Sequence, residues 1–79
     1  MAIEFDTPVA IAGPGGVVSV GTAAAAFDLL SDTSWPVRGL EHDQAIDAAL
    51  KVMDGHRSAV DARDALVRAA REAGVLIEE

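Results

Sequence analysis

Residues 8–19, PVAIAGPGGVVS, decide the fold because two short apolar runs flank a strong turn signal. The turn is GPGG at residues 13–16, where glycine supplies positive φ angles and proline fixes the bend. Extended strands are therefore expected over residues 8–12 and 17–18, with Ser19 at the end of the second strand or just beyond it. A two-stranded hairpin is only marginally stable alone, so this hairpin requires an apolar layer to pack against.

Two helices are expected after the hairpin, because apolar residues recur there at intervals of three and four. Ser19 is the expected N-cap of the first helix, with Thr22 as the rival cap, and residues 31–34 end it. The second helix is expected over residues 41–54, and Gly55 suits the left-handed residue that follows a helix. The predicted buried faces of these helices consist of Ala23, Ala26, Phe27 and Leu30, and of His42, Ala45, Ile46, Ala49, Leu50 and Met53.

A third helix is expected to begin after Ser58, with Asp61 completing a variant of the capping box, and to end at Gly74. Residues 75–77 are rich enough in β-branched side chains to add a third strand beside the hairpin. The prediction is a single α+β domain over residues 1–79, in which a small antiparallel sheet packs on three helices in the order ββααα(β). The predicted buried face of the third helix consists of Ala59, Ala62, Leu66, Ala69, Ala70 and Ala73.

Charge and composition narrow the classes of partner and location. The 79 residues include 13 acidic and 6 basic side chains, for a net charge of −7. This balance argues against nucleic acid and against an anionic membrane surface, because both are bound mainly by basic side chains. No cysteine is present, which excludes disulfides and thiolate metal sites. Residues 1–6 lack the basic start of a signal peptide, and no apolar run reaches membrane-spanning length, so a cytoplasmic protein is expected.

Motifs for catalysis are weak. The glycines at residues 13–16 lack the Lys-Ser/Thr ending of a phosphate loop. Asp54, His56 and Ser58 have the residue types of a catalytic triad, but neighbours on one turn cannot converge as a triad requires. His42 begins the apolar stripe of the second helix, so it is expected to be a partly buried, hydrogen-bonded imidazole. Asp43 would point about 100° away around the helix, which argues against a metal site. We therefore expect no enzymatic activity, no cofactor and no metal site.

Three residues are hard to explain by helix propensity or solubility, and they are the candidate interaction residues: Trp35, His42 and Arg63. Trp35 is expected to plug the space between the first helix and the hairpin, with an interface anchor as the alternative. Arg63 can pair with a carboxylate or contribute to a surface site. If the second and third helices pack antiparallel, Arg63 would lie nearer to Leu50 than to His42. This placement counts against a single cluster of Trp35, His42 and Arg63.

Several residues and motifs along nearly the whole chain resemble a known pattern. They are Val9, Ser19-Val20, Ala25, Phe27, Leu30, Trp35-Pro36, His42, Ala45, Met53-Asp54-Gly55 and the run ARDALVRAAREAG at residues 62–74. In these features the chain resembles family 982 among the domains of unknown function, which are small stand-alone proteins of alphaproteobacteria. The resemblance implies a shared fold over about residues 8–77. It implies no activity, cofactor or catalytic residue, because the family has none established.

The function predicted from these observations is a non-enzymatic protein-interaction or regulatory module that works through self-association or one protein partner. Its apolar content exceeds what one thin core can hide, and the second helix offers two candidate seams, His42-Ala49-Met53 and Ile46-Leu50. The alternative is a small-molecule-binding protein with a pocket between the sheet and the helices. Only Arg38, His42 and Arg63 are plausible polar groups for such a ligand.

Overall fold

The computed structural model describes residues 4–13 and 15–78, and it contains one three-stranded sheet. The strands are β1 (Glu4–Gly13), β2 (Gly16–Thr22) and β3 (Leu76–Glu78), in the spatial order β2-β1-β3 with both pairs antiparallel. Val9 lies opposite Val20, and Ile11 lies opposite Val18. Val9, Ile11 and Val20 are buried, so this face of the sheet is the core face. The third strand expected at the end of the chain is confirmed.

Both hairpin strands extend beyond the residues predicted for them. β1 begins at Glu4 and includes Pro8, which cannot donate to a ladder. The β1–β2 register shifts between Glu4 and Val9, and this irregularity accommodates the proline within a central strand. The turn expected at residues 13–16 joins the strands, with Gly13 paired to Gly16, whereas Pro14 itself lies outside the described residues.

The first helix is capped by Thr22, so the prediction of Ser19 as the cap is wrong and its rival is correct. Ser19 lies inside β2, which ends at Thr22. The Thr22 hydroxyl accepts a hydrogen bond from the Ala25 N–H at 3.0 Å and so satisfies one of the free donors at the start of α1 (Ala23–Ser31). Strand and helix therefore follow each other without a loop.

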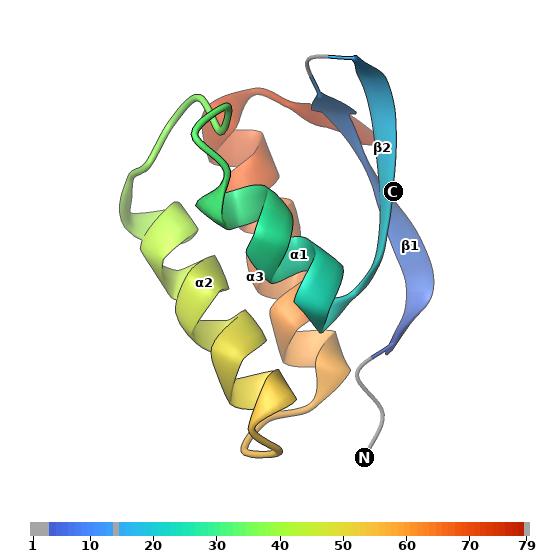
Figure 1. Cartoon of the computed structure of the whole chain (residues 1–79), viewed down its shortest axis with the longest axis vertical. Helices are drawn as coiled ribbons and strands as arrows, with labels where there is room; N and C mark the ends of the chain where they lie inside the picture. Colours follow the sequence, from blue (N-terminus) through green and yellow to red (C-terminus); the bar gives the residue numbers. More distant parts are fainter. Residues whose placement is uncertain (1–3, 14, 79) are drawn as a thin grey trace.

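The other helices, α2 (Leu40–Met53) and α3 (Ala59–Ala73), complete the helical layer on one side of the sheet (Figure 1). α1 packs against β2 and α3 packs against β1, while α2 packs on α1 and α3. The expected order ββααα(β) and the α+β class are thus confirmed. The other side of the sheet carries no helix among residues 4–13 and 15–78 (Figure 1).

The buried face of α2 differs from the prediction. Leu50 and Met53 were expected in the core, but they are 41% and 37% exposed, and Ile46 is only half-buried. Small residues take their place, because α2 packs against both α1 and α3 and presents to them the face that permits close approach. The buried residues of α2 are His42, Ala45, Ala48, Ala49 and Val52.

The third helix begins after Ser58 and ends at Gly74 as expected, but its predicted capping box does not form. Ser58 makes no side-chain capping bond, and the Asp61 carboxylate instead pairs with Arg57 at 3.3 Å. Gly74 has a φ of 71°, which is the left-handed conformation predicted for it. Ala59 and Ala73 are half-buried, and the fully buried residues of α3 are Ala62, Ala65, Leu66, Val67, Ala69 and Ala70.

Candidate functional site

Trp35 and His42 lie together in the interior. Trp35 is in the connection between α1 and α2 and is 4% exposed, and His42 is in the first turn of α2 and is 3% exposed. Their ring centroids are 6.2 Å apart and the rings are tilted by 42°. The expected burial of Trp35 is confirmed, and its ring neighbour is this imidazole. Neither side chain is presented on the surface.

The imidazole of His42 joins two helices. Its Nε2 lies 2.6 Å from the Leu30 carbonyl oxygen in a buried hydrogen bond. A carbonyl can only accept, so Nε2 carries the proton and donates it. Leu30 is in the last turn of α1, where carbonyls have no partner within the helix. The expectation of a buried, hydrogen-bonded imidazole is confirmed. Its Nδ1 has no hydrogen-bond partner among the residues described, and the Asp43 carboxylate is 3.8 Å away.

Arg63 is not part of this pair. It lies in the first turns of α3, half-buried, and its Nε donates to the Thr7 carbonyl oxygen at 2.7 Å. Thr7 is in the segment where the β1–β2 register shifts, so Arg63 binds the irregular part of β1 to α3. His42 lies in the first turn of α2, whereas the start of α3, which carries Arg63, follows the other end of α2. The 14 residues of α2 make this helix about 21 Å long. The three candidates therefore occupy two separate places.

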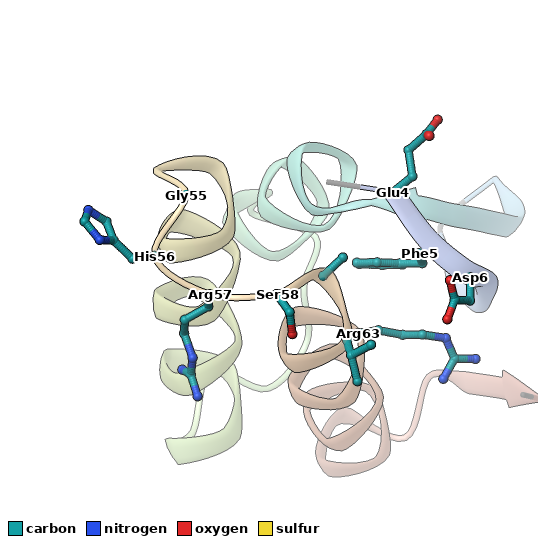
Figure 2. A pocket seen from close by; sticks show the side chains of 10 residues that line it. Glu4, Phe5, Asp6, Gly55, His56, Arg57, Ser58 and Arg63 are labelled. Atoms are coloured by element: carbon teal, nitrogen blue, oxygen red, sulfur yellow. The ribbon is translucent and has the colours of Figure 1, made fainter. Parts of the chain in front are cut away.

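A hollow of about 560 Å³ opens beside Arg63, between the start of β1 and the start of α3 (Figure 2). The Phe5 ring extends from β1 toward α3 and lies above the stem of Arg63, whereas Glu4 and His56 point away (Figure 2). Sequence reasoning missed Phe5 and Val60 as lining residues, because only the extension of β1 to Glu4 brings them together. The lining residues are Glu4, Phe5, Asp6, Gly55, His56, Arg57, Ser58, Ala59, Val60 and Arg63.

Of the polar groups predicted for a ligand, only Arg63 lines this hollow. Arg38 is exposed, and its guanidinium donates to the Asp32 carbonyl oxygen in the α1–α2 connection. The Ser34 backbone N–H, at 2.9 Å, and the Ser34 hydroxyl hold the pKa of the Asp32 carboxyl below its usual value, with a smaller contribution from Arg38. These contacts shape the connection that carries Trp35.

A second hollow, of about 400 Å³, follows the groove between α2 and α3 and is largely charged. Arg57 pairs with Asp61 at its wall, and the Nε of Arg68 lies 3.5 Å from a carboxylate oxygen of Glu41. No group of three or more His, Asp or Glu side chains able to hold a metal ion is found in the described part of the chain. No helix in that part is long and apolar enough to cross a membrane.

The uncovered side of the sheet is the most distinctive surface. Residues 7–27 contain no charged side chain, although the whole chain carries −7. They form most of β1, all of β2 and the start of α1. On the face away from the helices, Pro8, Ala12 and Ser19 are exposed, and Val17 is 67% exposed. The neutral part of the sheet, which comprises β2 and the part of β1 from Thr7 onward, is a surface that a protein could cover without burying a charge.

The chain is similar to proteins without an assigned role. It is 30% identical to the Agrobacterium tumefaciens protein Atu1219, a structural-genomics target whose structure was determined by NMR. The match covers 98% of this chain and 78% of that one, with a TM-score of 0.78. No curated protein matches. The family model DUF982, described as a protein of unknown function, matches residues 7–77, so the chain belongs to this family, as its sequence features indicated.

Proposed function

We propose that the protein is a non-enzymatic interaction module that works by self-association through the neutral part of its sheet, which comprises β2 and the part of β1 from Thr7 onward. The observation that supports this is the absence of charged residues from 7 to 27 in a chain of net charge −7. Two copies of an acidic protein repel each other wherever carboxylates meet. The neutral part of the sheet is a surface where they would not meet, and α1, α2 and α3 leave one side of the sheet uncovered (Figure 1).

The candidate residues support a structural rather than a catalytic role. The Nε2 of His42 is engaged by the Leu30 carbonyl, and the Nε of Arg63 is engaged by the Thr7 carbonyl. Both side chains thus hold one element to another. A role without chemistry is consistent with these contacts, and the absence of nucleic-acid and membrane partners stays a prediction of the charge. Cytoplasmic location likewise stays a prediction, which fractionation of source cells would test.

Sedimentation equilibrium tests the proposal directly. From 10 μM to 1 mM protein at physiological salt, we expect the mass to rise from 8.1 kDa toward twice that value. Val17→Asp should suppress the rise, because it places a carboxylate within the neutral surface that the second copy would cover. Leu40→Asp is the matched control: Leu40 is 68% exposed on α2, close to the 67% of Val17, and receives the same charge. A monomer at every concentration would refute self-association.

A small-molecule-binding function is the second candidate, and the hollow beside Arg63 favours it. Phe5, Ala59 and Val60 supply apolar surface there, and Arg63 supplies a cation at the edge. The expected ligand is therefore a largely apolar small molecule. Titration with 8-anilinonaphthalene-1-sulfonate should raise its fluorescence, and Val60→Arg should abolish the rise by filling the hollow. Leu40→Arg adds the same side chain elsewhere and should leave binding intact; equal effects of the two variants would reject this site.

A further inference from the structure

The outer edge of β2 is an open strand edge. The order β2-β1-β3 places β2 at one side of the sheet, and no strand of residues 4–13 or 15–78 pairs with its free side. The opposite edge of the sheet is formed by β3, which has only three residues, whereas β2 has seven. Short edge strands give an incoming strand little to bind, so β2 is the edge that can accept one.

The pairing of the hairpin shows which backbone groups face outward. Gly13 and Gly16 flank a two-residue connection, so they form a hydrogen-bonded pair, and Ile11 with Val18 is the next such pair. Ala12 and Val17 then form a non-bonded pair. The Ala12 N–H confirms this, because it donates away from β2, to the Val75 carbonyl at 2.8 Å. By this alternation, the N–H and C=O groups of Val17, Ser19 and Gly21 face the open edge.

Nothing in β2 protects this edge. Natural sheets protect open edges with charged side chains, prolines or bulges, and residues 16–22, GVVSVGT, contain no charge and no proline. The register is regular from Gly16 to Val20, so the ladder has no bulge there. Three valines and a threonine favour extended backbone along the strand. An open, neutral and regular edge of this kind is a template for strand addition.

We infer that β2 pairs antiparallel with β2 of a second copy, which makes one continuous six-stranded sheet; this inference rests on the proposed self-association. A two-fold axis at Ser19 overlaps the whole of Gly16–Thr22 with its copy. Ser19 then pairs with Ser19 of the second copy, and Val17 with Gly21. All are outward-facing residues, so about six hydrogen bonds form between the copies. Val18, which is partly exposed, comes to lie beside Val20 of the second copy.

Charge favours the edge of β2 over the exposed apolar residues of α2 as the surface for self-association. Leu50 and Met53 make an exposed stripe on α2, but Asp47 and Asp54 lie on the same helix and its end. A second copy docked there would bring like charges together, whereas β2 brings none. The occupant is a second copy because the edge is neutral and matches itself under two-fold rotation. Strand pairing of seven residues is a small interface, so the association should be transient.

Ser19→Pro tests the edge. Proline removes an N–H that faces the open side and leaves the β1–β2 bonds in place. We expect the dissociation constant to rise roughly tenfold to a hundredfold, since each copy loses one donor and gains a steric block. Ser19→Thr keeps the N–H and should associate like the parent chain. Ala12→Lys places a charge on the uncovered face of β1, away from the edge, and should also leave edge pairing intact.

Amide hydrogen exchange of the parent chain is a second test of pairing through β2 and requires no variant. The amides of Val17 and Ser19 should exchange fast at 10 μM and become protected at 1 mM, because only pairing covers them. If the parent chain dimerises but these amides stay unprotected and Ala12→Lys abolishes the dimer, the face and not the edge is the interface. The edge inference then fails while the proposed function stands. A parent chain that remains monomeric at 1 mM overturns both.

Discussion

Removing the imidazole of His42 should be among the most destabilising single changes in this protein. His42→Ala deletes the 2.6 Å bond to the Leu30 carbonyl and leaves that buried oxygen without a donor. An unsatisfied buried carbonyl costs about 1–3 kcal/mol. The lost ring also leaves a cavity beside Trp35, so the total approaches the ~3–5 kcal/mol of a buried aromatic truncation. The expected loss of stability reflects the role of the His42 side chain in holding α1 to α2.

Two further variants separate the bond from the volume. His42→Gln places an amide N–H where Nε2 now lies, so it retains a donor to Leu30 and should lose only about 1 kcal/mol. His42→Phe fills the space without a donor and should lose about 1–3 kcal/mol. The order of stability is therefore expected to be Gln, then Phe, then Ala.

Urea unfolding followed by tryptophan fluorescence is the suitable assay. Trp35 is the single tryptophan, is 4% exposed and lies next to His42, so its emission reports the integrity of this region. Measurements at low micromolar protein avoid the concentrations at which the proposed self-association is expected. A loss below about 1 kcal/mol for His42→Ala would show that the bond is not structural, and would restore His42 as a candidate for a surface role.

Three other predictions follow from burial, backbone conformation and charge. Leu50→Ala should cost less than about 1 kcal/mol in urea melts, whereas Leu66→Ala should cost about 2–5 kcal/mol; similar losses would contradict the observed face of α2. Gly74→Ala should cost about 1–2 kcal/mol from the φ of 71° alone, because nothing lies within 4 Å of an added Cβ, and an unchanged melting temperature would contradict that strain. The bonds from Ser34 lower the pKa of Asp32, so its carboxylate supports folding above about pH 4 and the support is lost as pH falls further; Asp32→Asn should flatten the stability curve below pH 4, and an unchanged curve would reject the linkage.

Local chemistry was sufficient to predict most of the architecture. The turn at residues 13–16, the helix end at Gly74 and the strand after it follow from glycine, proline and β-branched residues acting over a few positions. The choice between Ser19 and Thr22 as the cap was not decidable locally, since both hydroxyls are competent. It depends on how far β2 continues, and that is set by its pairing with β1.

Tertiary packing explains what the sequence could not predict. On α2, large apolar residues at helical spacing indicated that Leu50 would be buried. Packing against both α1 and α3 instead buries alanines of α2 and leaves Leu50 partly exposed. The hollow beside Arg63 needs Phe5 and Val60, which are far apart in the chain and meet only because β1 begins at Glu4. Burial of His42 was predictable, but its bond to Leu30 depends on where α1 ends.

If two copies pair through β2 as proposed, the three residues of β3 limit how large the assembly becomes. β3 covers the second side of β1, through Ala10 and Ile11, and it leaves β2 as the long open edge. A subunit with a single strand edge available for pairing forms a closed dimer and no larger assembly. A chain truncated before Leu76 would expose β1 as well and would carry two adhesive edges, which is the condition for open-ended fibre growth. Because β3 follows β1 and β2 in the chain, synthesis passes through that two-edged condition before β3 is added.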